Sequence, residues 1–181
     1  LVCFVDDRPD FYGIYHFSPV LNINFYGNVV DNNIFAGSQY MYLCVCYGGV
    51  ATGNQYVYNN TVSNNSRTGA GTQSGAAYVY CLWVQGSART FVHDNQIFNN
   101  SIPGQVSQKA YLYGLYMQPG NIVVYNNTIH DQMITSSFSG TSPTNTIYGG
   151  IYLQPSYHAN NSVHNNTVYN LTINLTGGGT G

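Results

Sequence analysis

The sequence predicts an all-β protein, a right-handed parallel β-helix (β-solenoid) of about five coils with an internal asparagine ladder. A motif of the form Val-x-(Asn/Asp)-Asn-x-(Ile/Val) occurs five times in 181 residues. The composition agrees, because the chain has no Glu and one Lys but 18 Tyr and many Val, Ile and Thr, which favour strands over helices. Disordered chains lack such aromatic and β-branched residues.

The five motifs begin at residues 29, 57, 92, 124 and 163, so their separations vary between 28 and 39 residues. A constant motif with variable spacing indicates that insertions fall at one corner of the repeat, which is typical of a solenoid. We assign residues 11–176 to the β-helix. Residues 1–10 are a lead-in segment or the remnant of a preceding coil, and residues 177–181 form a Gly-rich tail.

The second Asn of the motif is identical in all five copies. A sharp bend needs a residue that tolerates the left-handed conformation, and Asn does so while offering an amide that can bond to the next coil. These residues form the predicted structural ladder: Asn32, Asn60, Asn95, Asn127 and Asn166.

A second strand precedes each motif, most clearly at residues 113–119 and 149–155. Alternation places Leu115 and Met117 on one face and Tyr116 on the other. The outward positions form an aromatic column, interrupted at Cys46: Tyr15, Trp83, Tyr116 and Tyr152. Such a column either binds sugar faces or a protein, or only stabilises the sheet.

The motif and strand together resemble the parallel β-helix repeats of the pectin-lyase-like superfamily, over about residues 11–172. The resemblance implies the fold but leaves activity open, because the superfamily includes polysaccharide lyases, glycoside hydrolases, adhesins and structural proteins. Its enzymes need grouped carboxylates. Only the segment Asp6–Asp10, with Arg8, concentrates charge here. We assign no catalytic residue, metal ligand or cofactor.

Eight Asn-x-Ser/Thr sequons are candidates for glycosylation: Asn59, Asn64, Asn99, Asn126, Asn160, Asn165, Asn170 and Asn174. Only 6% of residues are charged, and glycans would add solubility. A secreted or cell-surface location follows from this. Cys44 and Cys81 are predicted to share a column on adjacent coils, where they would form a disulfide or remain two thiols.

The leading hypothesis is therefore an extracellular structural β-helix protein, glycosylated and able to stack head to tail into a filament. The alternatives are a polysaccharide lyase or hydrolase, or a fragment of one, and a sugar-binding adhesin module. Expected partners are other copies of the chain and carbohydrate. A net charge of −2 without a basic run gives no basis for nucleic-acid binding. No apolar run approaches the ~20 residues of a membrane span.

Overall fold

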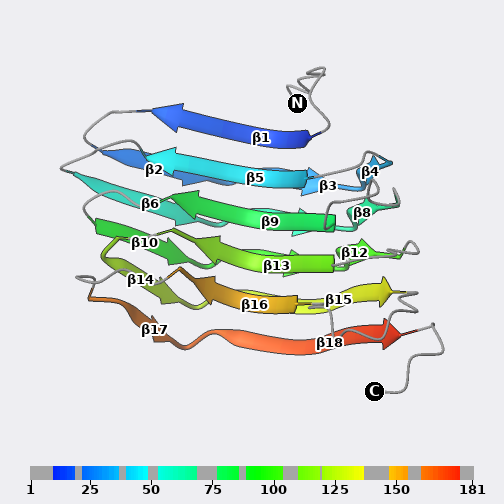
Figure 1. Cartoon of the computed structure of the whole chain (residues 1–181). Coiled ribbons are helices and arrows are strands. Elements are labelled where there is room, and N and C mark those ends of the chain that lie inside the picture. The colour runs from blue at the N-terminus through cyan, green and yellow to red at the C-terminus, as the bar shows by residue number, and fades with distance from the viewer. Residues whose placement is uncertain are drawn as a thin grey trace.

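A computed structural model describes residues 10–18, 22–36, 40–48, 53–68, 77–85, 89–103, 110–118, 120–136, 147–154 and 160–175. Every regular element in these ranges is a β-strand, and the strand pairs are parallel. The strands stack in chain order, from blue to red in Figure 1. The prediction of an all-β parallel β-solenoid is confirmed.

The chain passes repeatedly through three sheets. The first sheet contains β1 (Phe11–Ser18), β5 (Tyr40–Gly48), β9 (Ala77–Gln85), β13 (Ala110–Met117) and β16 (Ile147–Leu153). The second contains β2 (Ile23–Tyr26), β6 (Asn54–Tyr58), β10 (Arg89–His93), β14 (Ile122–Tyr125) and β17 (Ser162–His164). The third contains β3 (Val29–Asp31), β4 (Ile34–Phe35), β7 (Thr61–Ser63), β8 (Ser66–Arg67), β11 (Gln96–Phe98), β12 (Ser101–Ile102), β15 (Thr128–Ser136) and β18 (Thr167–Leu175).

Successive passages through the three sheets are not all alike. Three of them have the full set of four strands, β1–β4, β5–β8 and β9–β12. The last two have three strands each, because β15 and β18 run without a break through both parts of the third sheet. The predicted count of about five coils is therefore corrected. The chain makes about three turns with four strands each, followed by two passages with three strands each.

Two sharp corners, five residues apart, recur in every passage. Each has a residue with φ between 50° and 65°. The first corner holds Gly27, Asn59, Asp94, Asn126 and Asn165; the second holds Asn32, Asn64, Asn99, Asp131 and Asn170. Asn, Asp and Gly are the residues that adopt this left-handed conformation at least cost. The prediction that the ladder residues themselves adopt it was wrong, because the residue before each ladder Asn does.

The ladder follows the first corner: Asn28, Asn60, Asn95, Asn127 and Asn166. In each step the side-chain Nδ2 donates to Oδ1 of the next Asn at 2.8–2.9 Å. The backbone N–H of the same residue donates to that oxygen at 3.0–3.1 Å. Asn60, Asn95 and Asn127 are almost completely buried, so these bonds satisfy groups that water cannot reach.

Asn32 is not part of this ladder. Val29 pairs with Thr61, so the residue equivalent to Asn60 is Asn28, and Asn32 occupies the exposed second corner. The second corner has a shorter ladder that the sequence analysis missed, in which Asn33 donates to Asn65 and Asn65 donates to Asn100, both at 2.8 Å. The predicted ladder is correct for the other four residues.

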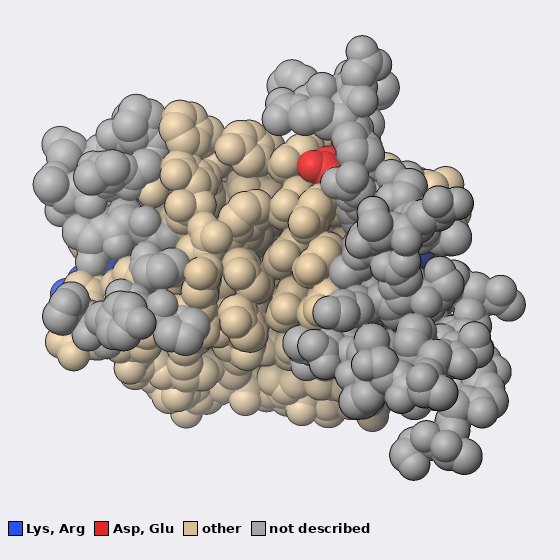
Figure 2. All heavy atoms as spheres, viewed as in Figure 1, with Lys and Arg blue, Asp and Glu red and all other residues tan. Residues whose placement is uncertain are grey.

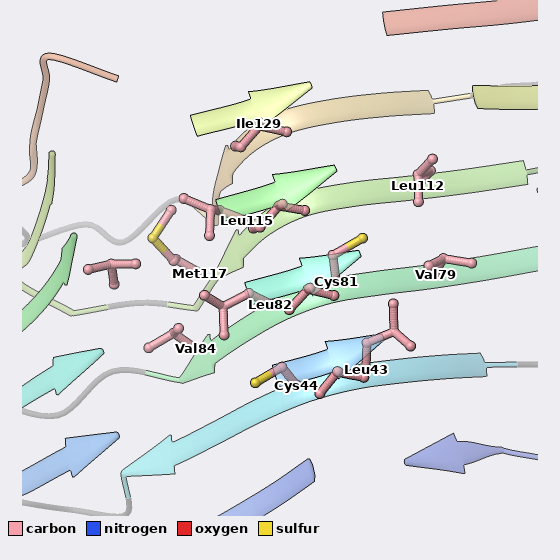
Figure 3. Packing of buried hydrophobic residues seen from close by; sticks show 14 of the residues in the cluster. Leu43, Cys44, Val79, Cys81, Leu82, Val84, Leu112, Leu115, Met117 and Ile129 are labelled. Carbon is pink, nitrogen blue, oxygen red and sulfur yellow. The ribbon is translucent and has the colours of Figure 1, made fainter. Parts of the chain in front are cut away.

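Aliphatic side chains from the three sheets fill the interior of the coil. Leu82 and Leu115 occupy one inward column, and Ile129 lies near them from the third sheet (Figure 3). The prediction that Cys44 and Cys81 share a column is wrong, because Cys44 pairs in register with Leu82; of the two alternatives for this pair, the structure has the two thiols. Cys44, Cys46 and Cys81 are free and buried. Burial raises the pKa of Cys46 to about 12, although a hydrogen bond from Gln55 opposes the shift.

Replacing Asn127 with Ala should lower the free energy of unfolding by about 3 kcal/mol or more, because the buried backbone N–H and Nδ2 of Asn95 lose their acceptor and the carbonyl oxygen of Val92 loses its donor. The matched control is Asn126→Gly at the preceding exposed corner, where Gly keeps the left-handed conformation and should cost less than about 1 kcal/mol. Urea denaturation measures both variants. Equal losses would contradict the role given to the ladder.

Candidate functional site: an aromatic face on the first sheet

The strands of the first sheet bend in the middle, where two consecutive residues both belong to the buried core cluster. These are Leu43 and Cys44 in β5, and Cys81 and Leu82 in β9. The equivalent position in β13 is Gly114, where a Cβ atom would lie 2.6 Å from the carbonyl oxygen of Gly150. The bend shifts the alternation by one residue, so outward side chains on its two sides are three residues apart.

Three outward aromatic columns result from this shift. The first contains Tyr40, Tyr78 and Tyr111; the second Tyr12, Tyr42, Tyr80 and Tyr113; the third Tyr15, Val45, Trp83, Tyr116 and Tyr152. The predicted column is therefore in register, but its interruption is Val45, and Cys46 is buried in the core cluster. The first two columns were missed. The spacing Tyr-x-Tyr-x-x-(Trp/Tyr), present in β9 and β13, is the sequence signal for them.

Within the first two columns, neighbouring rings stack face to face. Tyr78 and Tyr111 have ring centroids 4.5 Å apart and an angle of 6° between their planes. Tyr42 and Tyr80 are 5.1 Å apart at 8°. Pairs of this kind contribute about 0.5–1.5 kcal/mol each beyond the burial of their area. Because the ring faces are used in these contacts, the solvent meets mainly ring edges and hydroxyl groups.

Tyr80 joins the second and third columns. Its ring lies 5.7 Å from Trp83 and 4.9 Å from Tyr116, the latter at 78°. The indole N–H of Trp83 is buried, and no acceptor for it lies within the described part of the chain. In Figure 2 the described part of this face is almost entirely tan, so charged side chains are nearly absent from it.

Three tyrosine hydroxyl groups of the second column are hard to ionise. Burial raises the pKa of Tyr113 to about 12, with smaller contributions from Tyr152, Tyr116 and other tyrosines. The pKa values of Tyr42 and Tyr80 are also raised far above the ordinary range, again chiefly by burial. The hydroxyl groups of these three tyrosines therefore remain neutral hydrogen-bonding groups at physiological pH.

The described carboxylates lie apart from one another, at or near the corners or just before β1, and are engaged with neighbours. Asp31 accepts from Ser63 Oγ at 2.6 Å and Asn64 Nδ2 at 2.8 Å, and these bonds lower its pKa. Asp131 Oδ2 lies 2.6 Å from His130 Nδ1, and its other oxygen accepts from Asn170. The His130 contact is the main cause of the lowered pKa of Asp131.

Asp94 pairs with His93 at 2.7 Å in the same way. Across the ranges that the structure describes, no three His, Cys, Asp or Glu side chains form a group that could hold a metal ion. Asp6, Asp7 and Arg8, from the segment that the enzyme alternative requires, lie outside the described residues. Asp10 is described, and its Oδ1 accepts from the backbone N–H of Tyr40 at 3.2 Å.

All eight candidate glycosylation sites are exposed. Six of them are corner residues with positive φ: Asn59, Asn64, Asn99, Asn126, Asn165 and Asn170. Asn160 and Asn174 lie elsewhere in the last passage. The corners therefore carry both the tight turns and most of the sequons.

Comparison with protein-family models, curated proteins and solved structures found no match. The resemblance to the pectin-lyase-like superfamily therefore stays a prediction. None of the described segments forms a helix of the length and apolarity needed to cross a membrane.

Raising the pH from about 10 towards 12 should lower the free energy of unfolding. A tyrosine with a raised pKa is stabilised in its neutral form by folding, so the folded state loses this advantage once unfolded tyrosines ionise near pH ~10. A tyrosinate absorbance titration of the folded protein should show a late class near pH 12, and Tyr113→Phe should remove one member of it. A single transition of all tyrosines near pH ~10, with the protein still folded, would contradict the burial of these hydroxyl groups.

Proposed function

We propose that this chain is a structural protein of the cell surface or extracellular space, a right-handed parallel β-helix whose corners carry N-linked glycans. The proposal rests on the positions of the repeated polar side chains, inside the coil or at its exposed corners. The ladder Asn residues bond to one another inside the coil, and the sequon Asn residues before them are exposed. The residues that the sequence repeats most are thus engaged in supporting the coil or available for modification.

The right hand of the helix is proposed on general grounds. Crossover connections between parallel strands of one sheet are right-handed in about 98% of cases. The resemblance to the pectin-lyase-like repeats implies the same hand.

The enzyme alternative depends on Asp6, Asp7 and Arg8. Lyase activity on an acidic polysaccharide that disappears in the double variant Asp7→Asn, Arg8→Ala would favour this alternative over a structural role. The carboxylates of Asp31, Asp94 and Asp131 give it no support, because each lies at or beside a separate corner and is bonded to a neighbour.

Carbohydrate binding at the aromatic face is a second candidate. It is favoured by the buried N–H of Trp83, which lacks an acceptor among the described residues and lies beside the hydroxyl-bearing rings of Tyr80 and Tyr116. Glycan-array binding that is lost in Trp83→Phe would support it. Binding that survives both this change and Tyr116→Phe would dismiss it.

Expression in a glycosylating secretory host should give a secreted protein heavier than the chain mass of 19.9 kDa, and an N-glycan-removing enzyme should reverse the difference. A chain that is secreted without modification at any of the eight sites would contradict the glycosylated part of the proposal.

The corner geometry also predicts which glycosylation sites compete for space. Asn64 and Asn99 are neighbours in one column, and Asn99 Nδ2 donates to Asn64 Oδ1 at 3.2 Å. A spacing of ~4.8 Å leaves too little room for two glycans side by side. We expect at most one glycan on this pair, so Asn64→Gln should raise the occupancy of Asn99, while Asn160→Gln should not. Glycopeptide mass spectrometry measures the occupancy, and a majority of doubly modified molecules would contradict the expectation.

A further inference from the structure

The exposed large apolar side chains of the described residues are confined to the two ends of the solenoid. In the first passage they are Tyr15, Phe17, Tyr26, Val29 and Ile34. In the last passage they are Tyr152, Val163, Val168, Tyr169, Leu171 and Ile173. The intermediate passages contribute none to this set. Large apolar surfaces of this kind mark interaction sites more often than scattered single residues do.

At the C-terminal edge of the described residues, inward-facing side chains are exposed. Val163 continues the inward column of Val57, Val92 and Val124, and those three have 0% exposure whereas Val163 has 47%. Val168 is 41% exposed, although Ile129, its partner in the preceding passage, is completely buried. One more passage of strand on this edge would bury both.

The asparagine ladder gives the two ends opposite hydrogen-bonding character. Asn60, Asn95 and Asn127 each donate the backbone N–H and an Nδ2 hydrogen to the ladder Asn of the following passage, and each accepts at Oδ1 from the ladder Asn of the preceding passage. At the first passage, Oδ1 of Asn28 therefore has no donor among the described residues. At the last passage, the backbone N–H of Asn166 has no acceptor among them. An acceptor at one end and a donor at the other complement each other, whereas two like ends do not.

Other columns would continue across such a contact. The aromatic column Tyr26, Tyr58, His93, Tyr125 and His164 ends in stacked rings at both edges. The third aromatic column begins at Tyr15 and ends at Tyr152, with exposures of 48% and 37%. The described residues of the last passage, 147–154 and 160–175, include no Lys, Arg, Asp or Glu, so they present no formal side-chain charge to a partner.

We propose that a second copy of this chain docks its first passage on the last passage of another, in the register that continues the asparagine ladder. Asn166 of one copy then donates to Oδ1 of Asn28 of the next, and Val163 and Val168 become buried. The contact is heterologous and does not close, so copies add into a fibre. This inference deepens the proposed structural function and rests on it.

The test uses the full chain and the variant Val168→Lys. In the free chain the long Lys stem can cover the neighbouring side chains while its ammonium group reaches water, so the variant should fold. Docking would bury the charge, which is costly without a partner. Gln96→Lys is the matched control, because Gln96 is exposed on a middle passage. Circular dichroism confirms folding, and Val163→Lys is the replacement if Val168→Lys does not fold.

Analytical ultracentrifugation of the unaltered chain should show a mean molecular mass that rises with concentration and exceeds the mass of a dimer. Val168→Lys alone should remain a monomer, and Gln96→Lys should assemble like the unaltered chain. Val168→Lys keeps an unaltered first passage that can dock on a growing fibre, but its own last passage cannot accept another copy. When it makes up one part in ten of a mixture with the unaltered chain, it should therefore end growing fibres and lower their mean mass roughly two-fold or more.

A chain that stays monomeric at all concentrations would overturn the proposal, and so would assembly that stops at a dimer and is unchanged by added Val168→Lys. The latter result would indicate contact between like ends. Either outcome leaves the proposed secretion and glycosylation intact, because the host-expression experiment tests those separately.

Discussion

The hydrogen bond from one ladder Asn to the next is the interaction on which the rest of the structure depends. It joins passages that are 32 to 39 residues apart in the chain and it satisfies a backbone N–H and a side-chain amide with one oxygen. A neutral amide is suited to this position, because it both donates and accepts and carries no charge into the interior. The low charge of the chain is consistent with such a framework, in which few charged groups take part.

The corners and the bend determine what the framework presents to its surroundings. The left-handed residues turn the chain within a few positions, so each ladder Asn points inward and the residue before it points outward. In the first sheet, the bend at Leu43, Cys81 and Gly114 brings Tyr and Trp side chains from both halves of the strands to the same outer face. The sequons and the aromatic columns are thus products of the same backbone geometry that makes the interior continuous.

The fold could be predicted because the motif around Asn60, Asn95, Asn127 and Asn166 repeats almost unchanged. The first copy was misplaced for a physical reason. The two corners lie five residues apart and share the same local pattern, and Gly27 replaces the usual Asn or Asp at the first of them. Regular alternation also fails at the bend, so the Cys44–Cys81 pairing was wrong by one residue and Tyr40, Tyr78 and Tyr111 were missed. The function could not be predicted as far, because the repeated residues are required by the fold itself.

Amide hydrogen exchange tests the ladder most directly. The backbone N–H groups of Asn60, Asn95 and Asn127 face side-chain oxygens and lie outside the strands, so sheet pairing alone would not protect them. We predict that they exchange as slowly as the amides of the adjacent buried strand residues Val57, Val92 and Val124. Exchange of the three ladder amides at the rate of an unstructured chain, while the strand amides stay protected, would contradict the central role of the ladder.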